Sequence, residues 1–172
     1  MIFRKANIED LNRIWEITGM AKAQLKDLGL DQWQTGYPSL DLWQEDIAQG
    51  MCYVAEEEGN VFGAFTYQVT PDVSYAIIEN GSWLRDAPYA SMHRVIVADG
   101  CKGKGIAGQM FAYGFSMAVR DGFGSVRIDT HPGNIPMQHA LKKAGFKACG
   151  DIYLAVGPET GERRIGFERL LS

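Results

Sequence analysis

The hydrophobic pattern of the N-terminal half of the chain switches between the periods of helices and strands. Residues 2–5 predict a short strand, and residues 7–10 resemble a capping box without its usual Glu, ahead of a long amphipathic helix that ends at Gly29. A second helix is predicted over residues 39–49. Residues 51–57 and 61–69 predict a hairpin around a Gly59-Asn60 turn, and residues 75–78 predict a further strand. The apolar positions of the first helix are Leu11, Ile14, Trp15, Ile17 and Met20.

The C-terminal half continues this alternation. Residues 92–98 predict a strand, and residues 106–119 predict the helix that follows it. Residues 126–129, 147–154 and 164–170 predict three more strands, with a helix starting near Pro136 between the first two. The order predicts an α/β domain with a mixed, largely antiparallel sheet. The packing face of the helix over residues 106–119 comprises Ile106, Met110, Phe111, Phe115 and Met117.

A loop rich in Lys and Gly joins the strand over residues 92–98 to this helix. Glycines let the backbone turn tightly and approach a ligand closely, the first N–H groups of a helix lack intrahelical acceptors, and the helix dipole favours an anion. Lys102 and Lys104 add positive charge. The pattern predicts a phosphate site. A plain turn with close helix packing at Gly103, Gly105 and Gly108 is the alternative.

This loop and a second motif resemble the signatures of the GNAT family of N-acetyltransferases. The acetyl-CoA loop of that family reads Arg/Gln-x-x-Gly-x-Gly/Ala, and residues 102–107 follow it, with Lys102 in place of the planar Arg or Gln. Residues 134–146 resemble the second signature, an Asn that opens a helix ending in Gly-Phe. The resemblance implies one GNAT domain over residues 1–172. Its α/β fold would have a single mixed, mostly antiparallel sheet, with a central splayed parallel strand pair flanked by helices.

The resemblance also implies a donor and a reaction. In the GNAT fold acetyl-CoA lies in the opening between the splayed strands, where unpaired backbone groups can bind its pantetheine arm. The expected enzyme is an N-acetyltransferase that moves an acetyl group to a primary amine by direct attack on the thioester, with the Val97 N–H stabilising the oxyanion. The residues expected to bind acetyl-CoA are Val95, Val97, Lys102, Gly103, Lys104, Gly105, Ala107, Gly108 and Asn134.

The catalytic side chains are less clearly marked. In many GNAT enzymes a tyrosine seven residues after the Asn protonates the departing thiolate, and here that position is Leu141. Tyr153 is therefore the candidate acid, with a packed aromatic as the alternative. His93 is the first candidate base and His131 the second, because histidine titrates near neutral pH, although either can be structural. We interpret His139 as a surface residue.

Substrate selection in this family falls mainly to the first helices and the loop between them. Here that loop contains Gln32, Trp33 and Tyr37, which combine aromatic faces with an amide group. These residues are the candidates for acceptor binding, and a role in capping the core is the alternative. The acceptor is expected to be a small molecule or a peptide, and its identity stays open.

Two other functions remain open. Gly103-x-Gly105-x-x-Gly108, with Asp129 further on, also fits the fingerprint of a dinucleotide-binding protein. Only 43 residues follow Asp129, too few for the further βα units that such a domain needs. A non-catalytic acyl-CoA-binding sensor is the second alternative, because the tyrosine of the family is missing.

Composition and charge limit the class of protein, its partners and its cellular location. The 172 residues are 46% apolar and 22% charged, which predicts one globular domain, and the net charge of −4 argues against general nucleic-acid binding. No signal core or run of about 18 apolar residues occurs, so we expect a cytoplasmic protein without a membrane partner. Three cysteines without ligand spacing indicate neither disulfides nor a metal site. A homodimer is compatible with these features.

Overall fold

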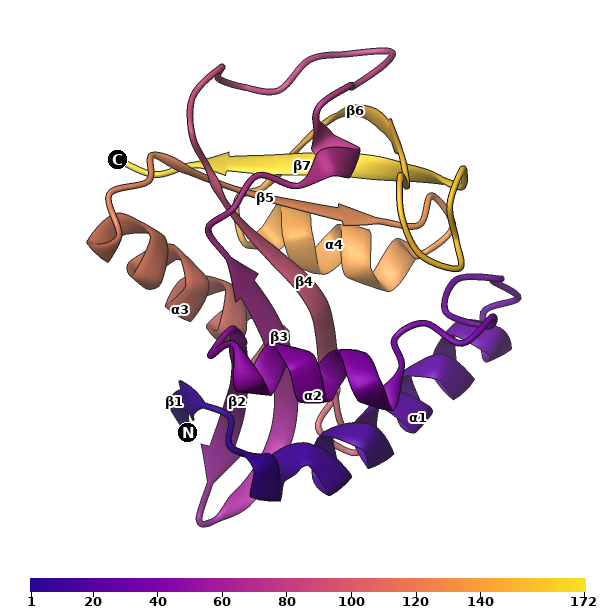
Figure 1. The fold of residues 1–172 in the computed structure, drawn as a ribbon, viewed down its shortest axis with the longest axis vertical. Helices are drawn as coiled ribbons and strands as arrows, with labels where there is room; N and C mark the ends of the chain where they lie inside the picture. Colours follow the sequence, from indigo (N-terminus) through magenta and orange to yellow (C-terminus); the bar gives the residue numbers. More distant parts are fainter.

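The computed structural model describes residues 1–172 and contains one seven-stranded sheet in the order β1-β2-β3-β4-β5-β7-β6. The strands are β1 Ile2–Lys5, β2 Cys52–Glu57, β3 Asn60–Gln68, β4 Ala90–Val97, β5 Ser125–Thr130, β6 Lys147–Tyr153 and β7 Arg163–Leu170. The helices are η1 Ile8–Asp10, α1 Leu11–Asp27, α2 Leu40–Ala48, η2 Val73–Tyr75, α3 Ile106–Arg120 and α4 Ile135–Lys143. Figure 1 shows α1 and α2 on one face of the sheet and α3 and α4 on the other.

The central strands β4 and β5 are parallel, whereas all other neighbouring strands are antiparallel. The parallel pairing covers only Ala90 with Val126 and Ser91 with Arg127. Beyond Ser91, β4 turns away from β5 (Figure 1). The fold is therefore the GNAT fold, with the mixed sheet that the sequence pattern predicts and the splayed strand pair that the resemblance implies. A dinucleotide-binding domain needs a doubly wound parallel sheet, so that alternative is wrong.

The 3-10 helix η1, which leads directly into α1, begins with a capping box that contains no Glu. Asp10 occupies its place, because the Asn7 N–H donates to Asp10 Oδ2 at 2.8 Å and the Glu9 N–H donates to Asn7 Oδ1 at 2.9 Å. Arg4 Nη1 also donates to Asp10 Oδ2, at 2.8 Å. This ion pair holds the pKa of Asp10 below its usual value and ties β1 to the start of the helix.

Close packing sets the position of α3 on the sheet. A Cβ at Gly114 would lie 2.4 Å from the sulfur of Met92, so any other residue would displace the Met92 side chain between α3 and β4. The predicted apolar face is buried at Ile106, Met110, Phe111 and Met117, and Phe115 is half-buried against the core. The N-terminus of α3 is thereby held at the open end of the strand pair.

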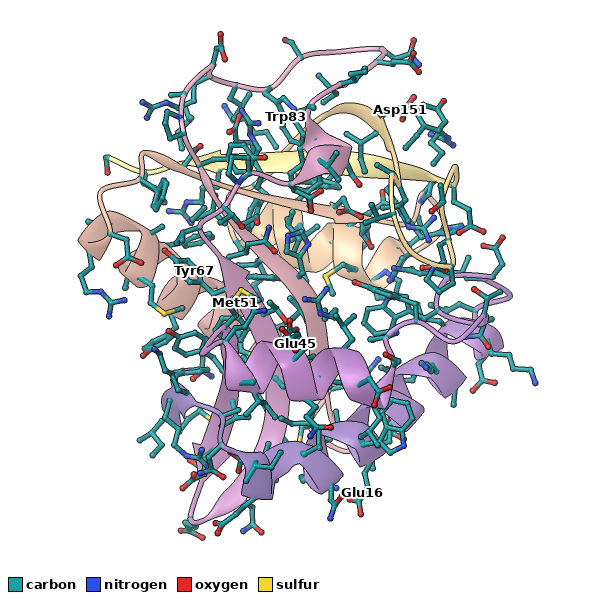
Figure 2. All side chains as sticks on the ribbon, in the orientation of Figure 1. Glu16, Glu45, Met51, Tyr67, Trp83 and Asp151 are labelled. Carbon is teal, nitrogen blue, oxygen red and sulfur yellow. The ribbon has the colours of Figure 1, made fainter.

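Two local predictions are wrong. The hairpin between β2 and β3 turns at Glu58 and Gly59, both with positive φ, one residue before the expected turn. The segment predicted as a strand at residues 75–78 instead begins with the last residue of η2 and continues without regular structure. Asp72 caps η2 by accepting the Ser74 N–H at 2.8 Å. Tyr75 is buried because its ring packs against Trp83, which lies over β7 (Figure 2).

Candidate active site

A cavity of about 1570 Å³ opens between the splayed strands and extends beneath the loop between α1 and α2. The start of α3 and the start of α4 form one part of its wall, and the segment before η2 and the β6–β7 loop form another. Of the residues predicted for the site, it is lined by Gln32, Trp33, Tyr37, His93, Val95, Val97, Lys102, Gly103, Gly105, Ala107, Gly108 and Asn134. Lys104 and Tyr153 are not part of its wall.

The loop before α3 presents a row of free backbone donors to this cavity. The N–H groups of residues 102–108 donate no hydrogen bond within the chain, and the first intrahelical bond of α3 runs from Gln109 to the Gly105 carbonyl at 3.0 Å. Gly103 and Gly105 have φ of 78° and 73°, which favour glycine, and a Cβ at either residue or at Gly108 would meet no other atom within 4 Å. The loop is therefore a cradle that fits an anionic ligand such as the CoA pyrophosphate.

The free edge of β4 leads from this cradle into the interior. The Ala98 N–H donates to Phe62 in β3 at 2.8 Å, and backbone groups on a strand alternate between its two edges. The backbone groups of Val95 and Val97 therefore point away from β3, toward the gap where β5 is no longer paired with β4. An extended ligand could bind there as an added strand would.

Asn134 caps α4 and forms part of the cavity wall. Its Oδ1 accepts the Met137 N–H at 3.2 Å, and its Nδ2 lies 3.5 Å from Gln32 Oε1. The second sequence motif is thus a helix cap with one amide contact to the loop between α1 and α2.

The predicted acceptor residues are held by charged neighbours. The Trp33 N–H donates to Glu159 Oε2 at 2.7 Å, which ties the α1–α2 loop to the β6–β7 loop. The Tyr37 hydroxyl accepts from Arg94 Nη1 at 2.8 Å, and its ring packs edge-on against Trp33. Figure 1 shows the two loops on the same side of the molecule, and residues of both loops line the cavity.

His93 lines the cavity on β4 and is largely buried. Its Nε2 lies 2.9 Å from Ser91 Oγ and 3.4 Å from Asp72 Oδ2. Burial, together with the neighbouring charge of Arg94, lowers the pKa of His93 to about 4. The imidazole is therefore neutral at pH 7.

A second titratable residue at the cavity, Asp129 on β5, was not among the predicted site residues. Its Oδ2 accepts from the Tyr75 hydroxyl at 2.7 Å. Burial raises the pKa of Asp129 to about 6, whereas the Tyr75 hydrogen bond opposes that rise. The sequence signal for this residue was a lone acid near the end of an apolar strand, five residues before Asn134, but we interpreted it only as a ribose-binding acid.

The other candidate catalytic residues lie elsewhere. Tyr153 is 44% exposed at the end of β6, and Leu141 is fully buried in α4. His131 holds the turn before α4, because its Nδ1 accepts the Gly133 N–H at 2.9 Å and its Nε2 lies 3.0 Å from Asp31 Oδ1. His139 is exposed. None of these four residues lines the cavity.

The chain has no group of three or more His, Cys, Asp and Glu side chains that could hold a metal ion. Cys52, Cys101 and Cys149 are free and buried. No helix combines the length and the apolar character needed to cross a bilayer.

Comparisons with known proteins agree with this geometry. Residues 11–146 match the family described as the acetyltransferase (GNAT) family. A GNAT acetyltransferase from Streptococcus agalactiae 2603 is 28% identical, with a TM-score of 0.87 over 99% of this chain and 95% of that one. Two further structures share the fold at 20% identity and cover 99% of this chain. They are a GNAT acetyltransferase from Listeria monocytogenes 4b F2365 (TM-score 0.72, 94% of that chain) and a ribosomal-protein-alanine N-acetyltransferase from Brucella melitensis (TM-score 0.66, 100% of that chain).

The comparison with curated proteins gives no match. The family match covers most of the chain, and the cradle, the splayed strands and the helix cap occur together in one cavity. The chain therefore belongs to the GNAT family and is an acetyltransferase of class EC 2.3.1.

Proposed function

We propose that this enzyme transfers the acetyl group of acetyl-CoA to a primary amine of a small molecule or a peptide by direct attack on the thioester. The observation that carries the proposal is the row of unpartnered N–H groups at residues 102–108, which continues into the free edge of β4. The two features can bind a pyrophosphate and an extended arm in one continuous path.

Each part of the path has its own residues in this proposal. Gly103, Gly105 and Gly108 let the pyrophosphate approach the backbone, and Lys102 adds charge at the cavity wall. The backbone of Val95 holds the arm. The N–H of Val97 donates to the thioester oxygen as negative charge develops on it.

The acceptor would enter from the side of Trp33 and Tyr37. Its nitrogen forms a bond to the acetyl carbon as the carbon–sulfur bond breaks. No tyrosine occupies the position of Leu141, and Tyr153 does not line the cavity, so we infer that the thiolate takes its proton through water. His93 is neutral and lines the cavity, but with a pKa of about 4 it is a weak base.

Calorimetry with CoA, acetyl-CoA and NAD tests the binding step. We expect CoA and acetyl-CoA to bind and NAD not to bind. Gly105→Glu should abolish CoA binding because its side chain fills the cradle. Gly59→Glu is the matched control, because Gly59 also has positive φ and open space but lies in the β2–β3 turn.

Thiol release from acetyl-CoA with a panel of primary amines tests the transfer step. Acetylated product should appear with at least one amine and be absent with Gly105→Glu. An intact thioester with the whole panel would favour a sensor, and unchanged CoA affinity in Gly105→Glu would remove the loop from the site.

A further inference from the structure

Two side chains face each other across the diverging strands on the acceptor side of the cavity. Ser91 pairs with Arg127, so His93 and Asp129, each two residues further along, lie on the same face of β4 and β5. The guanidinium of Arg127 on this face stacks on Tyr89 at 4.0 Å, which shows that the segment between β3 and β4 covers it. Tyr75 from that segment spans the gap: its hydroxyl reaches Asp129, and its ring stacks on His93 at 5.9 Å.

The Asp129 carboxylate has one oxygen engaged and one available. Oδ2 accepts the Tyr75 hydroxyl, whereas Oδ1 has no hydrogen-bond partner in the chain. Trp43 Nε1 is the only fully buried side-chain nitrogen or oxygen without a hydrogen-bond partner. Oδ1 of Asp129 also lacks a partner, so it must be accessible to solvent. Asp129 lines the cavity, so Oδ1 is reached from there.

No positively charged side chain forms an ion pair with Asp129. Asp72 comes from the segment before η2, and Glu159 from the β6–β7 loop adds a further carboxylate. Arg164 on β7 is the nearby cation, but its Nη2 lies 3.3 Å from Glu159 Oε1 and 3.1 Å from Glu162 Oε2. The other titratable neighbours are Tyr37, Tyr75 and His93, and each is neutral at pH 7.

We propose that Asp129 is the catalytic base that accepts a proton from the acceptor ammonium, and that Tyr75 is the positioning residue that holds its carboxylate. This proposal rests on the proposed acetyl transfer. A primary amine is mostly protonated at neutral pH, so the ammonium form is the one that meets the free Oδ1.

The proton balance is simple. The ammonium gives one proton to Asp129 Oδ1 and becomes a nucleophilic amine. Its nitrogen then bonds to the acetyl carbon, the carbon–sulfur bond breaks, and the second proton lost by the nitrogen ends on the thiolate. Asp129 afterwards releases its proton to solvent. The products are a neutral amide and the CoA thiol.

Asp129 also suits this role better than His93. A base works best when its pKa lies near the operating pH, and the pKa of Asp129 is raised to about 6 whereas that of His93 is lowered to about 4. The Nε2 of His93 is already held by Ser91 and Asp72, whereas Asp129 Oδ1 is free.

The test compares kcat/KM against pH for the wild type and Asp129→Asn, with the amine acceptor found in the panel. We expect Asp129→Asn to lose roughly 10²- to 10⁴-fold in kcat/KM at pH 7 with little change in acetyl-CoA affinity. The loss should shrink near pH 10, because the acceptor then arrives already deprotonated. A merely structural role would give a loss that does not recover at high pH.

Tyr75→Phe tests the positioning role separately. The phenol donates to the ionised carboxylate and so lowers the pKa of Asp129, and its removal should move the acidic limb of the profile to higher pH. Tyr67→Phe and Asp121→Asn are the matched controls, because Tyr67 donates to Asp121 at 2.9 Å outside the cavity wall. Figure 2 places Tyr67 on the side of the sheet near α3. Both control variants should keep the wild-type profile.

Several outcomes would overturn the assignment. Asp129→Asn with near wild-type kcat/KM at pH 7, in an enzyme that acetylates its acceptor, would remove Asp129 as the base while leaving the proposed function intact. A loss that is larger in His93→Gln than in Asp129→Asn would assign the role to His93. An unmoved acidic limb in Tyr75→Phe would exclude the positioning role, and this readout holds even if Asp129→Asn does not fold. A wild type that acetylates no amine would instead contradict the proposed function.

Discussion

Asp46 and Arg94 form a buried ion pair that fixes the bulge in β4. Asp46 Oδ2 lies 2.8 Å from Arg94 Nη2 and 3.0 Å from its Nε, and Thr66 Oγ1 donates to the same oxygen at 2.7 Å. Arg94 has φ of 51° where the register between β3 and β4 shifts by one residue. The bulge directly precedes Val95, so the pair links α2 to the strand edge proposed to bind acetyl-CoA.

Asp46→Asn should destabilise the protein strongly. Removal of one partner leaves the Arg94 charge buried and uncompensated, which costs about 3–5 kcal/mol. Urea unfolding measures this loss. Glu16→Gln removes an exposed partner of Arg13 on α1 and should cost less than about 1 kcal/mol (Figure 2). Equal losses in the two variants would contradict the structural role of the buried pair.

Gly108→Ala separates helix stability from ligand approach. Gly108 lies in the first turn of α3, and a Cβ there would meet no atom of the chain, so Ala should stabilise the free protein by up to about 1 kcal/mol. The same methyl should weaken CoA binding, because it projects where the pyrophosphate is proposed to lie. Gly19→Ala in α1 has the same open space outside the cavity and should stabilise without changing the CoA affinity measured by calorimetry.

Lys102 and Lys104 should contribute differently to CoA affinity, although they are only two residues apart. Lys102 lines the cavity, and burial lowers its pKa, whereas Lys104 does not form part of the wall. Lys102→Ala should raise the Kd for CoA about 3- to 10-fold, close to 1 kcal/mol. Lys104→Ala should leave it within about twofold. A titration at two ionic strengths checks the result, since the Lys102 contribution should fall as salt rises.

Tyr153→Phe should leave kcat unchanged. The side chain is exposed and lies outside the cavity, so its hydroxyl should not reach the thiolate, which is proposed to depart between β4 and β5. Steady-state assays with saturating acetyl-CoA measure the effect. A loss of 10²-fold or more would mean that Tyr153 is the acid after all and that the cavity rearranges when substrate binds.

The local pattern of the chain was enough to predict most of the elements. The apolar period of α3 and the alternation of β5 and β7 follow from residues that are neighbours in sequence, and all three appear within a few residues of the predicted bounds. The Lys/Gly loop and the Asn134 cap are also local, because a helix N-terminus uses the residues next to it. Each of these features can be recognised in the sequence without knowledge of the rest of the fold.

The arrangement of the acceptor side came only from the tertiary structure. Tyr75 lies 54 residues before Asp129, and Arg94 lies 48 residues after Asp46, so no local period relates the members of either pair. Contact between the members of these pairs depends on the register of β4 against β5 and on the path of the segment between β3 and β4. The same long-range packing left Tyr153 outside the cavity and raised the pKa of Asp129, because burial is a property of the whole fold. The sequence thus determined the family and the proposed binding path for acetyl-CoA, whereas the tertiary structure decided which side chains line the proposed acceptor side of the cavity.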